Sequence, residues 1–517
     1  MECGSLSIST APARAQHSTN GSTPATTVRH LLLAFIAFTS GHGFQIEEAT
    51  IEAIRSGFKN GSLTSTALVQ FYQDRIARLN PVLHAVIEVN PDALRQAKRA
   101  DAERCSCPHC CSGLHGIPVL LKDNIATRDR LNTTAGSFAL LGSVLRRAGA
   151  IILGKANMEE WANFRNLEGL HAWSSRGGQG RNPYVLSADP CGSSTGSAIA
   201  AAANMAAVTI GTETDGSILC PASLNSVVGI KPTLGLTSRA GVIPISPRQD
   251  TVGPICRTMS DAVRVLDTIV GYDSHDALAT KKASRYIPEG GYMQFLRADG
   301  LKGKRIGIPN GFFNYPNGTV QNLVFRQHLD MMRKHGAILI ENINIANLSV
   351  ILDVLNNGEQ IALPAEFKLS LDAYLSDLSY SPVRSLADII AFNNAHPIEE
   401  MLKEFGQLIF LVAETTTGIG APERTAILEL KKLSAYGLEE LMKDQKLDAI
   451  VTPNDSASSV LAIGGMPGIT VPAGYGKLGV PFGICFGGLK GYEPRLIQIA
   501  YAFEQATRVR KIPTFSP

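Results

Sequence analysis

The chain has little net charge and no long apolar run. Lys and Arg together number 48 and Asp and Glu 45, so the formal net charge is +3. This balance argues against a nucleic-acid binder, which would concentrate basic residues on one face. The apolar run at residues 31–38 is far shorter than the ~20 residues of a membrane-spanning helix. We therefore expect a folded protein of ordinary composition, with no nucleic-acid partner, no stable membrane span and no solenoid repeats.

Two common active-site signatures are also missing. The phosphate-binding loop Gly-x-x-x-x-Gly-Lys-Ser is absent, and so is the Gly-x-Ser-x-Gly turn of many serine hydrolases. Histidines are scattered, so the sequence nominates no Ser-His-Asp arrangement. Those considered are His42, His84, His109, His115 and His171.

Residues 1–43 differ in composition from residues 44–517, which are predicted to form one domain. Residues 1–27 are rich in Ser, Thr, Ala, Gly and Pro without a hydrophobic period, as in disordered segments. Residues 29–43 run from a basic pair through the apolar run to small residues, the order of a secretory signal. This order predicts a secreted or endomembrane protein, with an organelle or the cytoplasm as the alternative. Under the secretory interpretation the glycosylation acceptors are Asn60, Asn132, Asn317, Asn347 and Asn454.

Nine cysteines leave an odd number after any full disulfide pairing. Cys107, His109 and Cys110 have side chains that suit zinc. A structural zinc site needs a second ligand pair at a distance, and none is convincing, so a surface loop is the favoured interpretation and no metal is expected. The remaining cysteines in apolar or Gly-rich surroundings are interpreted as buried small residues: Cys191, Cys220, Cys256 and Cys485.

Apolar strand-like runs alternate with helical patterns along residues 44–517. The strands are expected at residues 117–122, 150–154, 227–230, 447–452 and 468–471. The helices are expected at residues 51–58, 65–79, 158–164, 197–208, 260–270, much of 386–414, and 422–445. This alternation predicts a single large α/β domain, with a mixed, mostly parallel, twisted β-sheet covered by helices on both faces.

The densest chemical signal lies between residues 190 and 233. Residues 191–197 (Cys-Gly-Ser-Ser-Thr-Gly-Ser) form a loop of small residues with several hydroxyls. Such a loop lets backbone approach a ligand closely, and its hydroxyls can relay protons. Ser217 follows a tight Gly turn and precedes an apolar segment. That position predicts an exposed corner, with preceding backbone N–H groups free to face an oxyanion.

Several segments together resemble the amidase-signature family. They are residues 116–124 (Gly-Ile-Pro-Val-Leu-Leu-Lys-Asp-Asn), the serine loop 192–197, residues 211–218 (Gly-Thr-Glu-Thr-Asp-Gly-Ser-Ile) and residues 229–233 (Gly-Ile-Lys-Pro-Thr). In that family the relay serine lies 24 residues before the nucleophile, as Ser193 does before Ser217. The resemblance extends from about residue 44 to the C-terminus and is strongest to the peptide-amidase-like branch, which includes plant members.

The resemblance implies the amidase-signature fold and a serine amide hydrolase without a cofactor. Ser217 would be the nucleophile, Ser193 the proton relay and Lys122 the base. Burial at the end of a strand would lower the pKa of Lys122. The backbone N–H groups of Thr214, Asp215, Gly216 and Ser217 would form the oxyanion hole, with Ser194 as a further binding residue. The resemblance also implies a cis peptide bond between Gly192 and Ser193.

Some features depart from the family or leave alternatives open. Cys191 and Thr195 stand where the family usually has Gly, and residues 141–149 join two segments that the family separates by about a dozen more residues. The expected substrate is a small carboxamide, an N-acyl amine or a peptide C-terminal amide, and the sequence does not identify which one. The alternatives are the glutaminase subunit of a tRNA-dependent amidotransferase and a catalytically impaired amidase-like scaffold. The sequence leaves the oligomeric state open.

Overall fold

A computed structural model describes residues 44–106, 113–127, 129–141, 151–166 and 171–515. The signal-like residues 29–43, the Cys107–Cys110 group and residues 142–149 of the shortened segment lie outside the described residues. In the described part of the chain, no helix is both long enough and apolar enough to cross a membrane.

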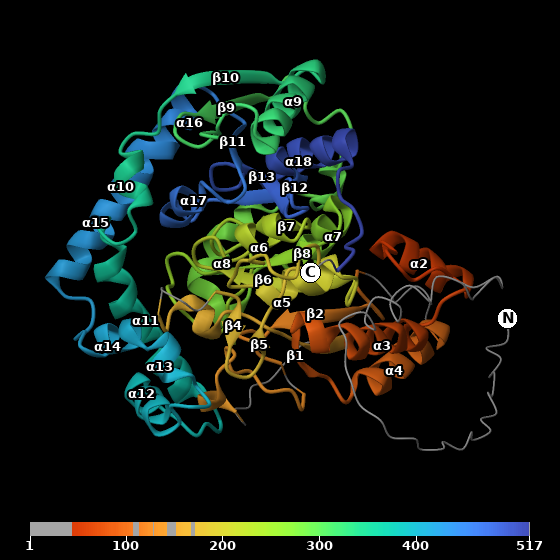
Figure 1. The fold of residues 1–517 in the computed structure, drawn as a ribbon, viewed down its shortest axis with the longest axis vertical. Helices are drawn as coiled ribbons and strands as arrows, with labels where there is room; N and C mark the ends of the chain where they lie inside the picture. The colour runs from red at the N-terminus through yellow and green to blue at the C-terminus, as the bar shows by residue number, and fades with distance from the viewer. Residues whose placement is uncertain (1–43, 107–112, 128, 142–150, 167–170, 516–517) are drawn as a thin grey trace.

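Most strands join one large sheet, in the order β1-β3-β2-β6-β8-β7-β12-β13-β11-β9-β10 (Figure 1). Two short strands, β4 and β5, pair separately. The strands are β1 Val86–Val89, β2 Pro118–Lys122, β3 Ile151–Ala156, β4 Trp173–Ser174, β5 Gly178–Gln179, β6 Val208–Glu213, β7 Val228–Lys231, β8 Thr251–Cys256, β9 Arg305–Pro309, β10 Ile338–Ile343, β11 Ala449–Pro453, β12 Gly468–Tyr475 and β13 Pro481–Gly487.

The expected α/β fold with a mixed sheet is confirmed. Parallel pairing lies toward the two ends of the sheet, where β2 pairs with β3 and β6, and β9 pairs with β10 and β11. The central strands β8, β7, β12 and β13 alternate in direction. All residues of β6, β11 and β13 are buried, as expected for strands covered on both faces.

Helices cover both faces, as predicted. The described helices are α2 Ile51–Asn60, α3 Ser65–Leu83, α4 Ala93–Ser106, α5 Thr195–Ala202, α6 Leu219–Leu224, α7 Met259–Ile269, α8 Ala277–Ala283, α9 Val320–Lys334, α10 Leu348–Leu352, α11 Glu359–Asp377, α12 Leu386–Ala395, α13 Leu402–Phe405, α14 Leu408–Glu414, α15 Ala421–Ser434, α16 Glu440–Asp444, α17 Ser458–Gly464 and α18 Glu493–Thr507.

The alternation along β8 separates the two helical layers. Ile255 belongs to a cluster with buried Ala residues of α5 and α6, whereas its neighbour Cys256 belongs to the larger cluster that contains residues of α7 and α18. Successive side chains of a strand point to opposite faces, so α5 and α6 cover one face and α7 and α18 the other. The close approach of α5 depends on small side chains, because residues 195–202 are all buried and, apart from Thr195 and Ile199, are Gly, Ser or Ala.

Two helix predictions are wrong in extent or type. The helix predicted over residues 197–208 ends at Ala202, and Val208 already begins β6. The helix predicted over residues 158–164 is only a 3-10 turn with left-handed backbone at Trp161 and Ala162. The N–H of Trp161 donates to Ala135 O at 2.8 Å, so a tertiary hydrogen bond replaces a helical one.

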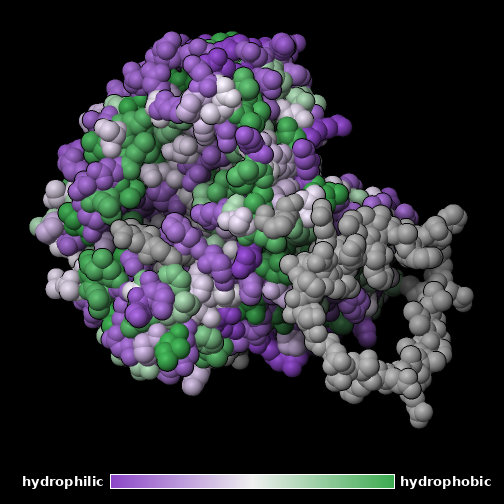
Figure 2. Space-filling model, in the orientation of Figure 1, coloured by the Kyte–Doolittle hydropathy of each residue, from purple (hydrophilic) through white to green (hydrophobic). Residues whose placement is uncertain are grey.

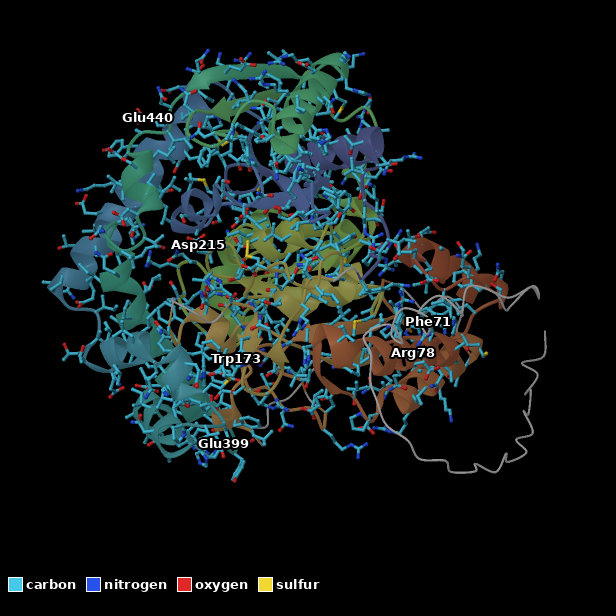
Figure 3. The ribbon with its side chains drawn as sticks, viewed as in Figure 1. Phe71, Arg78, Trp173, Asp215, Glu399 and Glu440 are labelled. Atoms are coloured by element: carbon cyan, nitrogen blue, oxygen red, sulfur yellow. A yellow bond between two sulfur atoms is a disulfide. The ribbon has the colours of Figure 1, made fainter. Side chains whose placement is uncertain are left out.

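Helices α10 to α15 form an arm along one side of the core, at the left of Figure 1. Within the arm α11 packs against α14 and α15. Its lower part rests on an apolar cluster in which Phe367 and Phe410 meet Trp161. Figure 2 shows a hollow between this arm and the core. Asp215, next to the predicted nucleophile, lies at the edge of the core that faces the arm (Figure 3).

Candidate active site

Lys122 is held at the end of a buried strand. Strand β2 lies between β3 and β6, and all five of its residues are buried. Lys122 has no exposed surface. Its Nζ donates to Ser193 Oγ at 2.7 Å and to Thr212 O at 3.1 Å. The amine therefore joins the serine loop to the end of β6.

The serine loop precedes α5 and is tied to the same strand end. The Gly192–Ser193 peptide bond is cis, as the resemblance implied. Ser193 is 1% exposed. Ser194 N donates to Ser217 O at 3.1 Å, and Ser194 Oγ donates to Thr212 O at 3.0 Å. The Ser194 hydroxyl also accepts the N–H of Thr212, so it connects the two loops through backbone groups.

A sharp turn between β6 and α6 carries Ser217. Gly216 adopts a φ of +76°, which an L side chain would strain. Glu213 Oε2 accepts the N–H groups of Ile218 and Leu219 at 2.7 and 2.9 Å, which closes the turn. Sequence reasoning did not single out Glu213, although it lies inside the quoted motif and is a buried carboxylate paired with backbone donors.

Ser217 is less exposed than predicted. Its exposed fraction is 8%, so it lies at the floor of a buried turn rather than on an exposed corner. Within the residues that the structure describes, the Ser217 hydroxyl donates to no protein acceptor, and the N–H groups of Asp215 and Gly216 are likewise without protein acceptors. The N–H of Ser217 has none there either. This turn therefore offers unused donors beside a nucleophilic oxygen.

The loop at residues 245–250 supports the turn from the side of the arm. Thr214 Oγ1 donates to Asp250 Oδ1 at 2.7 Å, and the N–H groups of Ile245 and Ser246 donate to Asp250 Oδ2. Burial raises the pKa of Asp250 to about 6. Ser246 Oγ in turn donates to Glu366 of α11 at 2.7 Å. A continuous set of hydrogen bonds thus connects α11 with the turn.

The electrostatics of the site make the neutral amine of Lys122 accessible near neutral pH. Burial lowers the pKa of Lys122 to about 7, against the opposing negative charges of Glu159, Glu213 and Asp250. An ammonium in water has a pKa near ~10.4, so the protein removes most of the preference for the charged form. An amine that is part neutral near pH 7 can accept a proton from an adjacent hydroxyl.

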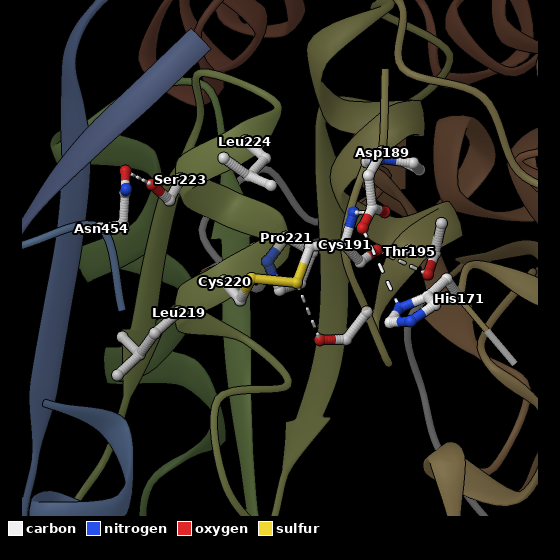
Figure 4. The surroundings of a disulfide bond; sticks show 12 residues. His171, Asp189, Cys191, Thr195, Leu219, Cys220, Pro221, Ser223, Leu224 and Asn454 are labelled. Carbon is white, nitrogen blue, oxygen red and sulfur yellow. Dashed lines mark hydrogen bonds and ion pairs between the residues drawn. A yellow bond between two sulfur atoms is a disulfide. The ribbon is translucent and has the colours of Figure 1, made fainter. Parts of the chain in front are cut away.

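A disulfide joins Cys191 to Cys220, which corrects their interpretation as buried small residues (Figure 4). Cys191 lies two residues before Ser193, and Cys220 is the second residue of α6, three residues after Ser217. The two cysteines are 29 residues apart in the sequence, and their pairing was not predicted because it depends on how the fold brings the two loops together. Cys256 and Cys485 are buried free cysteines, as predicted. The described residues hold no group of His, Cys, Asp and Glu that could bind a metal ion.

A family model for amidases matches residues 67–462. The chain belongs to the amidase family. A protein of Arabidopsis thaliana named "Probable amidase At4g34880" is 58% identical over 91% of this chain and 92% of its own length. The solved structure of native peptide amidase from Stenotrophomonas maltophilia has a TM-score of 0.85 and 41% identity, covering 92% of this chain and 100% of that one.

The amidase is more distant from amidotransferases. A glutamyl-tRNA(Gln) amidotransferase subunit of Thermoanaerobacter pseudethanolicus is 30% identical over 91% of this chain and 98% of its own length. The higher identity to the plant protein and to peptide amidase supports the primary prediction over the amidotransferase alternative. The chain is therefore an amidase-family hydrolase of amide C–N bonds.

Proposed function

We propose that this amidase cleaves its substrate through an acyl-enzyme on Ser217, with Ser193 relaying protons to neutral Lys122. The observation that carries the proposal is the 2.7 Å contact between Lys122 Nζ and Ser193 Oγ, both buried, in a loop whose next residue, Ser194, donates its N–H to Ser217 O. When Nζ is neutral, its lone pair can take the Ser193 proton across this contact. Ser193 then takes the proton of Ser217.

In the acylation step Ser217 Oγ attacks the carbonyl carbon and forms a C–O bond. The proton that reaches Lys122 returns through Ser193 to the amide nitrogen, and the C–N bond breaks with release of ammonia or an amine. Water then attacks the ester, and its proton follows the same relay in reverse to Ser217. The carboxylic acid leaves, and the enzyme returns to its starting protonation state.

The negative oxygen of each tetrahedral intermediate needs donors that are already in place. We assign this role to the backbone N–H groups of Thr214, Asp215, Gly216 and Ser217. Three of these groups, those of residues 215–217, have no protein acceptor in the described part of the chain. Loss of one such donor in comparable sites costs about 3–4 kcal/mol in the transition state. Ser194 acts indirectly, since its hydroxyl is bonded to the backbone of Thr212.

The substrate we propose is a small or peptide carboxamide, with a peptide C-terminal amide favoured over an N-acyl amine. The support is the likeness at 41% identity to a protein named peptide amidase. The hollow in Figure 2 lies on the side of the core where Figure 3 labels Asp215, and we place the acyl group of the substrate there.

The test compares the parent with Ser217→Ala and with Ser376→Ala. Ser376 is an exposed serine on α11 whose hydroxyl donates to Ala373 O. Each protein is given a panel of peptide amides, simple carboxamides and N-acyl amines, and a fluorophosphonate label. We expect amide hydrolysis and labelling by the parent and the control, and neither by Ser217→Ala. Equal hydrolysis by Ser217→Ala would disprove the assignment of Ser217. No labelling of the parent would instead support the scaffold alternative.

We also propose that the protein is secreted or resides in the endomembrane system. The support is the signal-like order of residues 29–43 and the Cys191–Cys220 disulfide, since disulfides persist mainly in oxidising compartments. Among the glycosylation acceptors, three are exposed: Asn60, Asn317 and Asn347. By contrast, Asn454 Oδ1 accepts hydrogen bonds from Ser223 Oγ and Gly483 N. Intact-mass measurement before and after glycan removal tests this. An unglycosylated protein that still begins at Met1 would reject it.

A further inference from the structure

Glu159 contacts the relay segment through its backbone. It lies between β3 and the turn at Trp161, and it is 4% exposed. Its N–H donates to Ser193 O at 3.1 Å. Its own carboxyl is held in place from the other side, because Ala172 N donates to Oε1 at 3.0 Å. The backbone of Glu159 thus contacts Ser193, while a separate hydrogen bond from Ala172 holds the Glu159 carboxyl group in place.

The carboxyl of Glu159 also packs flush against Gly192. A Cβ added at Gly192 would lie 2.2 Å from Glu159 Cδ and 2.5 Å from Oε1, so a larger residue there would displace the Glu159 side chain. Glu159 therefore touches both residues of the Gly192–Ser193 peptide, one with its side chain and the other with its backbone. Ser193 in turn lies against Lys122 Nζ.

The charge of Glu159 reaches Lys122 more strongly than that of the other carboxylates. Three carboxylates oppose the lowering of the pKa of Lys122, and Glu159 has the largest such effect, followed by Glu213 and Asp250. Glu213 and Asp250 are each neutralised in part by two or more donors. Within the described residues the Glu159 carboxyl accepts one hydrogen bond, from Ala172.

Among the described residues, few other titratable groups act on Glu159. Besides Lys122 they are His171 and Asp189, which lie 4.0 Å apart at the rim of the site and are largely exposed. Burial raises the pKa of Glu159, and the positive charges of His171 and Lys122 lower it. Solvent screens the charges of His171 and Asp189. The interaction between Glu159 and Lys122 takes place instead between buried groups, where the dielectric constant is low.

We propose that Glu159 is a positioning residue for amide hydrolysis, which supports the Gly192–Ser193 peptide and sets the pH range in which Lys122 acts as the base. This inference rests on the proposed roles of Ser193 and Lys122. Glu159 neither bonds to the substrate nor takes part in the proton relay. It acts through the position of Ser193 and through a charge that stabilises the ammonium form of Lys122.

The two parts of the role separate in two variants. Glu159→Gln keeps the length and can still accept the Ala172 N–H, but it removes the charge. Without that charge the ammonium form of Lys122 is less stable, so the acid limb of kcat/KM moves to lower pH. Glu159→Asp keeps the charge but withdraws it from Gly192. The acid limb then stays near its parent position, while kcat falls by about tenfold to a hundredfold, as for a small misplacement of a reacting group.

The control is Glu504→Gln on α18. Glu504 Oε1 also accepts one backbone N–H, from Met259, but Glu504 is not among the groups that act on Lys122. We expect its acid limb and kcat to match those of the parent. The pH dependence is measured for amide turnover and for the rate of fluorophosphonate labelling, which reports on Ser217 directly.

An acid limb of Glu159→Gln that coincides with that of the parent would overturn the electrostatic part. A shift of equal size in Glu504→Gln would overturn it too. Parent-like kcat in Glu159→Asp would overturn the positioning part, and this variant serves alone if Glu159→Gln does not fold. Failure of the proposed function is recognised separately, by hydrolysis or labelling that persists in Ser217→Ala.

Discussion

Replacement of Cys191 and Cys220 by Ala should lower the thermal stability of the enzyme by a calculable amount. The disulfide closes a loop of 29 residues. A loop of that length restricts the unfolded chain by an entropy worth about 3.6 kcal/mol at 25 °C. A chain of 517 residues gains about 1 kcal/mol/K of entropy on unfolding. The melting temperature should therefore fall by about 3 °C.

The assay is scanning calorimetry of the parent and of the double variant, each with and without a reductant such as a trialkylphosphine. Reductant should lower the melting temperature of the parent more than that of the double variant. Thiol titration of the denatured proteins should show that reduction releases two more thiols in the parent than in the double variant. Because the two cysteines flank the segments that carry Ser193 and Ser217, kcat should fall more than KM changes.

Two results would refute this reasoning. One is a double variant that melts at the parent temperature without reductant, since the loop constraint would then contribute nothing. The other is an equal number of thiols in the denatured parent before and after reduction, which would mean that the bond does not form.

Two further predictions concern buried charges. Since burial lowers the pKa of Lys122 to about 7, kcat/KM should fall about tenfold per pH unit below pH 7, as the amine is protonated, and level off above it; a flat profile down to pH 5 would contradict this. Arg165→Met should destabilise the protein by about 3–5 kcal/mol in urea unfolding, because fully buried Glu160 and Glu400 lose their shared cation; a loss under 1 kcal/mol would contradict this.

The motifs of the site were predictable because they are local. Lys122 ends a continuous apolar strand, and the turn at Ser217 has its own glycine, so the sequence indicates the backbone at both places. The Cys191–Cys220 bond was not predictable in the same way, since it depends on where two loops meet in the fold. At Trp161 the local pattern misled: it predicted a helix, but the structure has a short turn in which the Trp161 N–H donates to Ala135 O.

The supporting carboxylates were harder to find than the motifs. Glu159 and Asp250 are buried by segments from elsewhere in the chain, and in the sequence each is one acidic residue among many. Strands β1, β4, β5, β6, β8, β9, β10 and β13 were also missed. Among them β10 is the strand at one edge of the sheet and has several exposed residues. Its assignment depends on pairing with β9, a tertiary interaction.

The loop at residues 245–250 limits how this enzyme can be redesigned. On one side α11 holds the loop through Glu366, which bonds Ser246 and Arg248, and through Glu359, which bonds Gln249. On the other side Asp250 of the same loop accepts a hydrogen bond from Thr214, in the turn before Ser217. An arm transplanted from a relative to change substrate range therefore alters turnover as well, unless both acceptors on α11 are carried with it.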